Sequence, residues 1–103
     1  MVYFSFIIII SEEMTEEELE NFKQKIISTT SFPGVYMYKF IIKSENRNIA
    51  LVENLFEEDA DIHTKESENG KYISITARQV VISAEEVIEV YKKASVIEGI
   101  IFL

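Results

Sequence analysis

The sequence contains no cysteine, a single histidine and only three glycines among its 103 residues. The absence of cysteine excludes disulfide bonds, thiol nucleophiles and thiolate metal ligands. His63 has no second imidazole or thiolate to join it in a metal site. Three glycines are too few for a glycine-rich loop that cradles phosphate. We therefore expect no metal and no cofactor, and the sequence singles out no catalytic residue.

Long apolar runs are also missing, since the longest covers only residues 6–10. A helix needs about 20 apolar residues to cross a bilayer, so the sequence predicts no membrane span. The first residues lack the basic region of a secretory signal, and Glu12-Glu13 stand where a small-residue cleavage site would lie. We expect a cytoplasmic, bacterial protein. The Met14-Thr15-Glu16 stretch reads as a second candidate for the native start, beside Met1.

Positive charge is scarce, with 10 basic residues against 18 acidic ones and a net charge of −8. Residues 1–34 and 35–103 are both acidic. Such a chain repels phosphate backbones and anionic lipid head groups. We expect neither nucleic acid nor a membrane surface as a partner.

The length fits one domain, preceded by a short extension. Residues 1–10 are apolar enough for a buried strand, and Thr15 with Glu18 forms a capping-box pattern before a helix over 15–28. Residues 35–103 then read as strand, helix, strand, strand, helix and strand. We therefore predict an N-terminal extension over 1–30 and a domain over 31–103.

The two middle strands form the best-specified unit. Asn69-Gly70 predicts a type I′ turn, with Glu68 opposite Lys71. This register places Ile62 opposite Ala77 and Asp61 opposite Arg78. One face of the hairpin is then mainly apolar and the other polar, and a slip by one residue would mix them.

Two strand-helix-strand units joined by a hairpin predict a definite fold class. With right-handed crossovers they give an α+β, ferredoxin-like βαββαβ antiparallel sheet with two helices on one face. The N-terminal strand and helix are added to this unit. The aromatic face of the strand over 35–43 should meet the helices.

Four short motifs occur in order: Ser31-Phe32-Pro33, Ser67-x-x-Gly70-x-Tyr72-x-Ser74-Ile75-Thr76, Ser83-x-Glu85-x-Val87 and Ile97-Glu98-Gly99-Ile100. Together they resemble the YbeD-like family, a domain of unknown function, over about residues 31–103. The resemblance implies a ferredoxin-like fold similar to small regulatory domains that bind metabolites beside some biosynthetic enzymes. The family has no established activity, so the resemblance transfers no catalytic residue.

The polar face of the predicted sheet carries the candidate ligand-binding residues, which are Lys39, Lys65, Tyr72, Ser74, Thr76 and Arg78. They are suited to a small anionic metabolite or an acidic protein partner. The alternatives are an ordinary solvated sheet face, or one covered by the helix over 15–28. We interpret the protein as a ligand-binding or regulatory module with no catalysis of its own.

Two other functions stay open. His63 would be the general base of a small enzyme, although a solvated strand histidine is the simpler interpretation. The last strand, expected over residues 96–103, carries no charge after Glu98, and its part from Ile100 to Leu103 would lie at a sheet edge as an unprotected template for pairing. Residues 2–10 or a second copy of the chain would pair with it, which makes the protein an adaptor or a homodimer.

Overall fold

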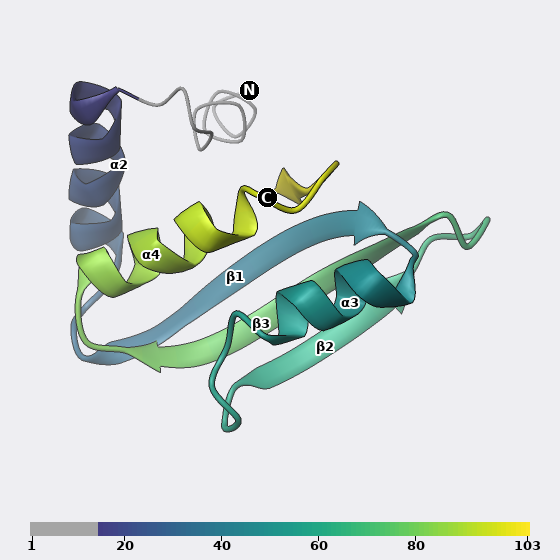
Figure 1. Cartoon of the computed structure of the whole chain (residues 1–103). Coiled ribbons are helices and arrows are strands. Elements are labelled where there is room, and N and C mark those ends of the chain that lie inside the picture. The colour runs from purple at the N-terminus through teal and green to yellow at the C-terminus, as the bar shows by residue number, and fades with distance from the viewer. Residues whose placement is uncertain (1–14) are drawn as a thin grey trace.

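The computed structural model describes residues 15–103, which form three helices and a four-stranded sheet (Figure 1). The elements, in chain order, are α2 (Glu16–Thr29), β1 (Gly34–Lys43), α3 (Asn46–Glu53), β2 (Asp61–Glu66), β3 (Tyr72–Val81), α4 (Ala84–Ala94) and β4 (Ile101–Phe102). The predicted mixture of helices with an antiparallel sheet is confirmed. The strand predicted over 1–10 lies outside the described residues.

The strands lie in the order β2-β3-β1-β4, and every neighbouring pair is antiparallel. The two longest strands, β1 and β3, therefore occupy the centre. Helices α3 and α4 cover one face of the sheet (Figure 1). Helix α2 packs against α4, and its Phe22 and Ile26 belong to the same core as the sheet.

Buried and exposed residues alternate along the central strands, and the buried ones form this core. In β1, Tyr38, Phe40 and Ile42 are fully buried, whereas Lys39 between them is exposed. Successive side chains of a strand point to opposite faces, so one face of β1 is aromatic and dry. The predicted orientation of the aromatic face toward the helices is confirmed.

The hairpin has the predicted register but a different turn. Asp61 pairs with Arg78 and Ile62 with Ala77, as predicted. A type I′ turn needs positive φ at both central residues, and in the described chain only Gly70 (φ 71°) and Gly99 have it. The Asn69 side chain instead accepts hydrogen bonds from the Lys71 backbone N–H (3.0 Å) and the Ser67 hydroxyl (2.9 Å). These bonds close a longer loop over 68–71, so the predicted pairing of Glu68 with Lys71 is wrong.

Two of the three described helices begin at a residue whose side chain caps the helix. The capping box of Thr15 and Glu18 opens α2, and Ser83 caps α4. At the start of α3, Ser44 and Asn46 are of the types that cap helices, but the N-cap is Glu45, which makes no side-chain capping bond. The last strand was predicted to extend over residues 96–103 and has only two residues. Backbone turns at Ile97 and Ile100, with Gly99 at φ 76° between them, keep the chain out of the sheet until Ile101.

Three tyrosine hydroxyls lie in or beside the core. Tyr36 and Tyr91 share a hydrogen bond of 3.1 Å, whereas the buried Tyr38 hydroxyl bonds to no residue of the described chain. Burial raises the pKa of all three tyrosines above the ordinary value, so each stays protonated at neutral pH. None of them is therefore available as a base.

Replacing Tyr38 by phenylalanine should raise the free energy of unfolding by about 1 kcal/mol, because it removes a buried hydroxyl without a partner. Replacing Tyr36 by phenylalanine should lower it by about 1 kcal/mol, because the Tyr91 hydroxyl then loses its hydrogen bond. Urea unfolding of the two variants beside the parent chain measures both effects. An equal loss of stability in both variants would contradict this difference between the hydroxyls.

Candidate functional site

The six predicted residues do lie on one face of the sheet, the one that α3 and α4 leave open. Neighbouring strands bring them together in rows, with Lys65 opposite Ser74 and Thr76 between His63 and Lys39. Tyr72 and Arg78 lie at either end of this stretch of β3. The intervening residues of β3, such as Ile75 and Ala77, are buried beneath the helices. We call this surface the open face.

Helix α2 does not cover the open face. It packs against α4 on the opposite side of the sheet, where the rings of Phe22 and Tyr91 meet edge to face with centroids 5.4 Å apart. The Lys23 ammonium and the Glu85 carboxylate, 3.6 Å apart, add a contact between the same helices. Of the alternatives for the open face, coverage by this helix is excluded.

His63 lies among solvated side chains. Its Nε2 is 2.9 Å from Oδ1 of Asp61, while Nη1 of Arg78 is 3.9 Å from the other oxygen of that carboxylate. The side chains of His63 and Asp61 are 65% and 60% exposed. A general base works best in a pocket where burial and neighbours tune its pKa, and this position offers water on most sides. Asp61 therefore connects β2 to β3 through Arg78, and does not orient His63 as a general base within a pocket.

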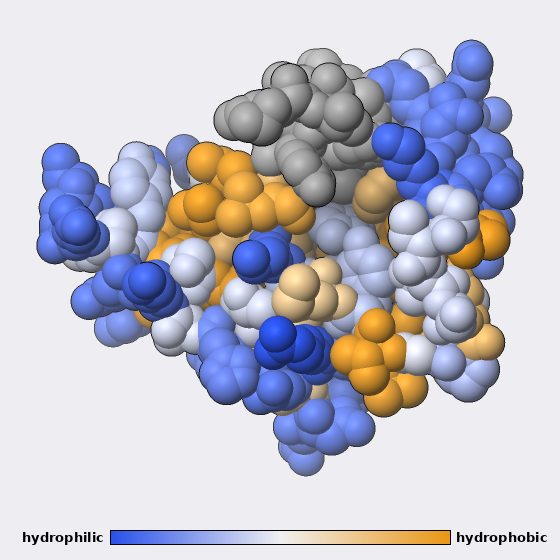
Figure 2. Space-filling view, turned by 180° about the vertical axis from the view of Figure 1, so that it is seen from behind, coloured by the Kyte–Doolittle hydropathy of each residue, from blue (hydrophilic) through white to orange (hydrophobic). Residues whose placement is uncertain are grey.

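Apolar side chains also belong to the open face, although none of the six candidate ligand-binding residues is aliphatic. Val35, Met37, Val80 and Ile101 are all exposed, as are Ile82 and Leu103 at the ends of their strands. In Figure 2, which looks onto this face, hydrophobic surface gathers in two patches with hydrophilic surface between them. The alternation that places Lys39 and Arg78 on this face also places Met37 and Val80 there, since each lies two positions from one of them.

The charge of the open face is opposite to that of the chain. Among residues 15–103, the paired strands place one carboxylate, Asp61, on the face that carries Lys39, Lys43, Lys65 and Arg78, in a protein whose net charge is −8. Lys39 and Arg78 lie in the rows between the Val35–Val80 pair and the Ile41–Ile101 pair, whereas Lys65 lies on the outer strand β2 and Lys43 ends β1. A partner that combines acidic and apolar groups would match both properties.

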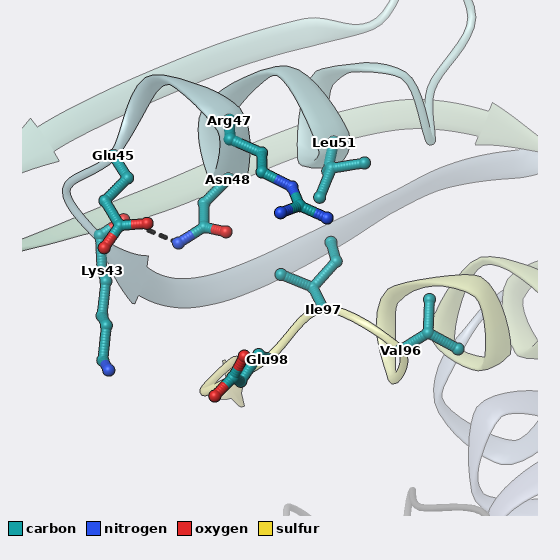
Figure 3. Close-up of a pocket in the computed structure, with 8 residues that line it drawn as sticks. All are labelled: Lys43, Glu45, Arg47, Asn48, Leu51, Val96, Ile97 and Glu98. Carbon is teal, nitrogen blue, oxygen red and sulfur yellow. Dashed lines mark hydrogen bonds between the residues drawn. The ribbon is translucent and has the colours of Figure 1, made fainter.

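A pocket of about 370 Å³ lies between the start of α3 and the segment that follows α4, and shares only Lys43 with the open face (Figure 3). Its lining residues are Lys43, Glu45, Arg47, Asn48, Leu51, Val96, Ile97 and Glu98. Asn48 is buried and donates from Nδ2 to the Lys43 carbonyl oxygen at 3.3 Å. Two basic and two acidic side chains offset one another here, so the pocket favours no single charge. The sequence did not predict this pocket, because its walls come from segments about 50 residues apart.

A family model described as "Protein of unknown function (DUF493)" matches residues 27–103. The chain belongs to the DUF493 family. This is the YbeD-like family that the four motifs resemble. The comparison with curated proteins gives no match, and neither does the comparison with solved structures.

The hairpin motif of this DUF493 domain has a structural role. The Ser67 hydroxyl accepts a hydrogen bond from the Tyr72 backbone N–H at 3.1 Å and donates to Asn69, and Gly70 supplies the positive φ. Within residues 15–103, no cluster of three or more His, Cys, Asp or Glu side chains could hold a metal ion. None of the helices in that part of the DUF493 chain has the length and apolar character of a membrane span.

Proposed function

We propose that this DUF493 domain is a ferredoxin-like binding module without catalysis, whose open face docks an acidic protein segment that also carries apolar side chains. The single observation that carries the proposal is the surplus of basic over acidic side chains beside exposed apolar ones, on a sheet face that no helix of residues 15–103 covers. Patches of this mixed character on a small protein mark interaction sites.

The order of elements supports the ferredoxin-like part of the proposal. The chain runs β1-α3-β2-β3-α4-β4, and its sheet has β1 and β3 at the centre with β4 beside β1. Each helix connects two strands that are separated in the sheet by one antiparallel strand. Such crossovers lay both helices on one face and leave the other free for a partner.

The shape of the open face favours a protein segment over a small metabolite. Small-molecule sites are concave and enclose most of the ligand. The open face is a sheet surface from which Val35, Met37 and Val80 project into solvent, and the pocket of Figure 3 lies away from them. An extended or helical segment can span both apolar patches while its carboxylates meet Lys39 and Arg78.

Reversing two charges of the open face should weaken docking at least about 10-fold, because each surface ion pair contributes up to about 1 kcal/mol. The variant is Lys39→Glu with Arg78→Glu, and the probe is a short synthetic peptide in which glutamate alternates with leucine. Amide chemical-shift changes on titration give both the affinity and the residues that respond. The matched control, Lys92→Glu with Lys93→Glu, makes the same change of charge on α4 and should alter the affinity less than about 2-fold.

Three outcomes would contradict the proposed function. Shifts that avoid the open face would move the site elsewhere, and equal weakening by the control would mean that only net charge matters. Citrate offered as a small polyanion should bind far more weakly than the peptide. If it binds the open face with the same affinity, the occupant is a small anion and not a protein segment.

A further inference from the structure

The two edges of the sheet are built differently. The outer strand β2 exposes Asp61, His63, Lys65 and Glu66, and charged side chains of this kind discourage pairing with another strand. The other outer strand, β4, has only two residues and pairs only with Phe40 and Ile41. Upstream of these residues, β1 itself forms the edge of the sheet within the part of the chain that the structure describes.

The free backbone groups of this edge can be identified from the hydrogen-bond pattern. The Leu103 N–H donates to the Lys39 carbonyl oxygen at 2.9 Å, so the backbone of Lys39 faces away from β3. Alternate residues of a strand share this direction, which places the N–H and C=O groups of Val35 and Met37 at the same edge. Among the described residues, the structure gives these groups no hydrogen-bond partner.

The same segment lacks the features that protect other edges. Residues 35–38 contain no charge and no proline, and the unbroken register between β1 and β3 leaves no room for a bulge. An exposed, uncharged strand edge with free backbone groups is a template for strand addition. In a chain with a net charge of −8, this uncharged stretch is also where a second acidic chain meets the least repulsion.

We propose that two copies of this chain pair through β1 about a two-fold axis, with Val35 of one copy opposite Met37 of the other. Antiparallel strands under two-fold symmetry place residue i opposite j and j opposite i. The two outward-facing residues, two positions apart, therefore form two hydrogen-bonded pairs, each of which exchanges both N–H···O=C bonds. Because the edge of β1 can form these bonds with an identical edge, we infer that its partner is a second copy of the chain.

The side chains brought together by this pairing are compatible. Val35 would lie beside Met37 of the partner subunit on the open face, and both are exposed apolar residues in the single chain. The half-buried Tyr36 would lie beside its own copy on the helix side of the sheet. The two open faces would then become one continuous surface. The dimer does not depend on the proposed function, since it uses the edge and not the partner that docks on the face.

The test compares two double variants of the full chain by sedimentation over a range of protein concentrations. Val35→Lys with Met37→Lys would put lysines opposite each other across the axis, where like charges destabilise pairing. The dimer dissociation constant should rise at least about 10-fold. Val80→Lys with Ile82→Lys is the matched control: Val80 is as exposed as Val35 (60% against 61%), yet β3 lies inside the sheet. The control should change the constant less than about 2-fold.

Amide hydrogen exchange of the unsubstituted chain gives a second, independent reading. Exchange at Val35 and Met37 should slow as the protein concentration rises, whereas Thr64, which faces outward on the β2 edge, should stay unchanged. A monomer at all concentrations overturns the proposal. So does a dimer that the first variant leaves intact, or one that the control weakens equally, because contact would then be through the open face.

Discussion

Replacing Phe40 by alanine should lower the free energy of unfolding by about 3–5 kcal/mol, the usual loss for a phenylalanine removed from a packed core. Its side chain is fully buried in β1. The ring packs against Phe102 and Tyr91, with centroids 5.4 and 6.0 Å away, and so joins the sheet to α4 and to the short β4. A domain of this size has about 5–15 kcal/mol of stability, so the variant should be only marginally folded. Urea unfolding monitored by circular dichroism measures the loss.

Two further substitutions show whether the effect comes from the core. Phe40→Leu keeps most of the buried volume and should cost about half as much as the alanine variant. Tyr72→Ala removes an aromatic ring from the open face, where the side chain is 44% exposed, and should cost about 1 kcal/mol or less. Equal losses for Phe40→Ala and Tyr72→Ala would mean that the ring of Phe40 is not packed as described.

The sequence predicted most of the sheet because its strands have one polar, solvent-exposed face and one apolar, buried face. In β3 the apolar residues Ile73, Ile75 and Ala77 alternate with polar ones, and this pattern predicted the covered face and supported the register that followed from the Asn69-Gly70 turn. The same pattern failed at the last strand. Residues 96–103 are nearly all apolar, so composition alone could not reveal that Gly99 delays the strand until Ile101.

The candidate site was predicted only in part, for a related reason. Charged and polar side chains draw attention in a sequence, and Lys39 and Arg78 were found in that way. Alternation also assigns apolar side chains such as Val35 and Val80 to that face, but the sequence alone does not show whether they are exposed to solvent or covered by another segment. The pocket beside α3 and the free edge of β1 depend on chain segments that only tertiary structure brings together.

Two consecutive residues of β3 belong to opposite faces of the sheet, one to the core and one to the open face. Ile75 is 1% exposed and points beneath the helices, and its neighbour Thr76 points to the open face between His63 and Lys39. A charge buried without a partner costs several kcal/mol, which is comparable to the whole stability of a small domain. Ile75→Asp should therefore leave the chain unfolded at room temperature, with the loss of the far-ultraviolet signal of its helices.

Thr76→Asp introduces the same carboxylate one residue later and should leave the fold intact. The expected cost is about 1 kcal/mol or less, since aspartate is only a poor strand former and its carboxylate stays in water near Lys39. The same variant lowers the basic surplus of the open face and should weaken docking of the acidic peptide. If Thr76→Asp unfolds the chain while Ile75→Asp folds, the two faces of the sheet are exchanged. The surface proposed for docking would then be part of the core.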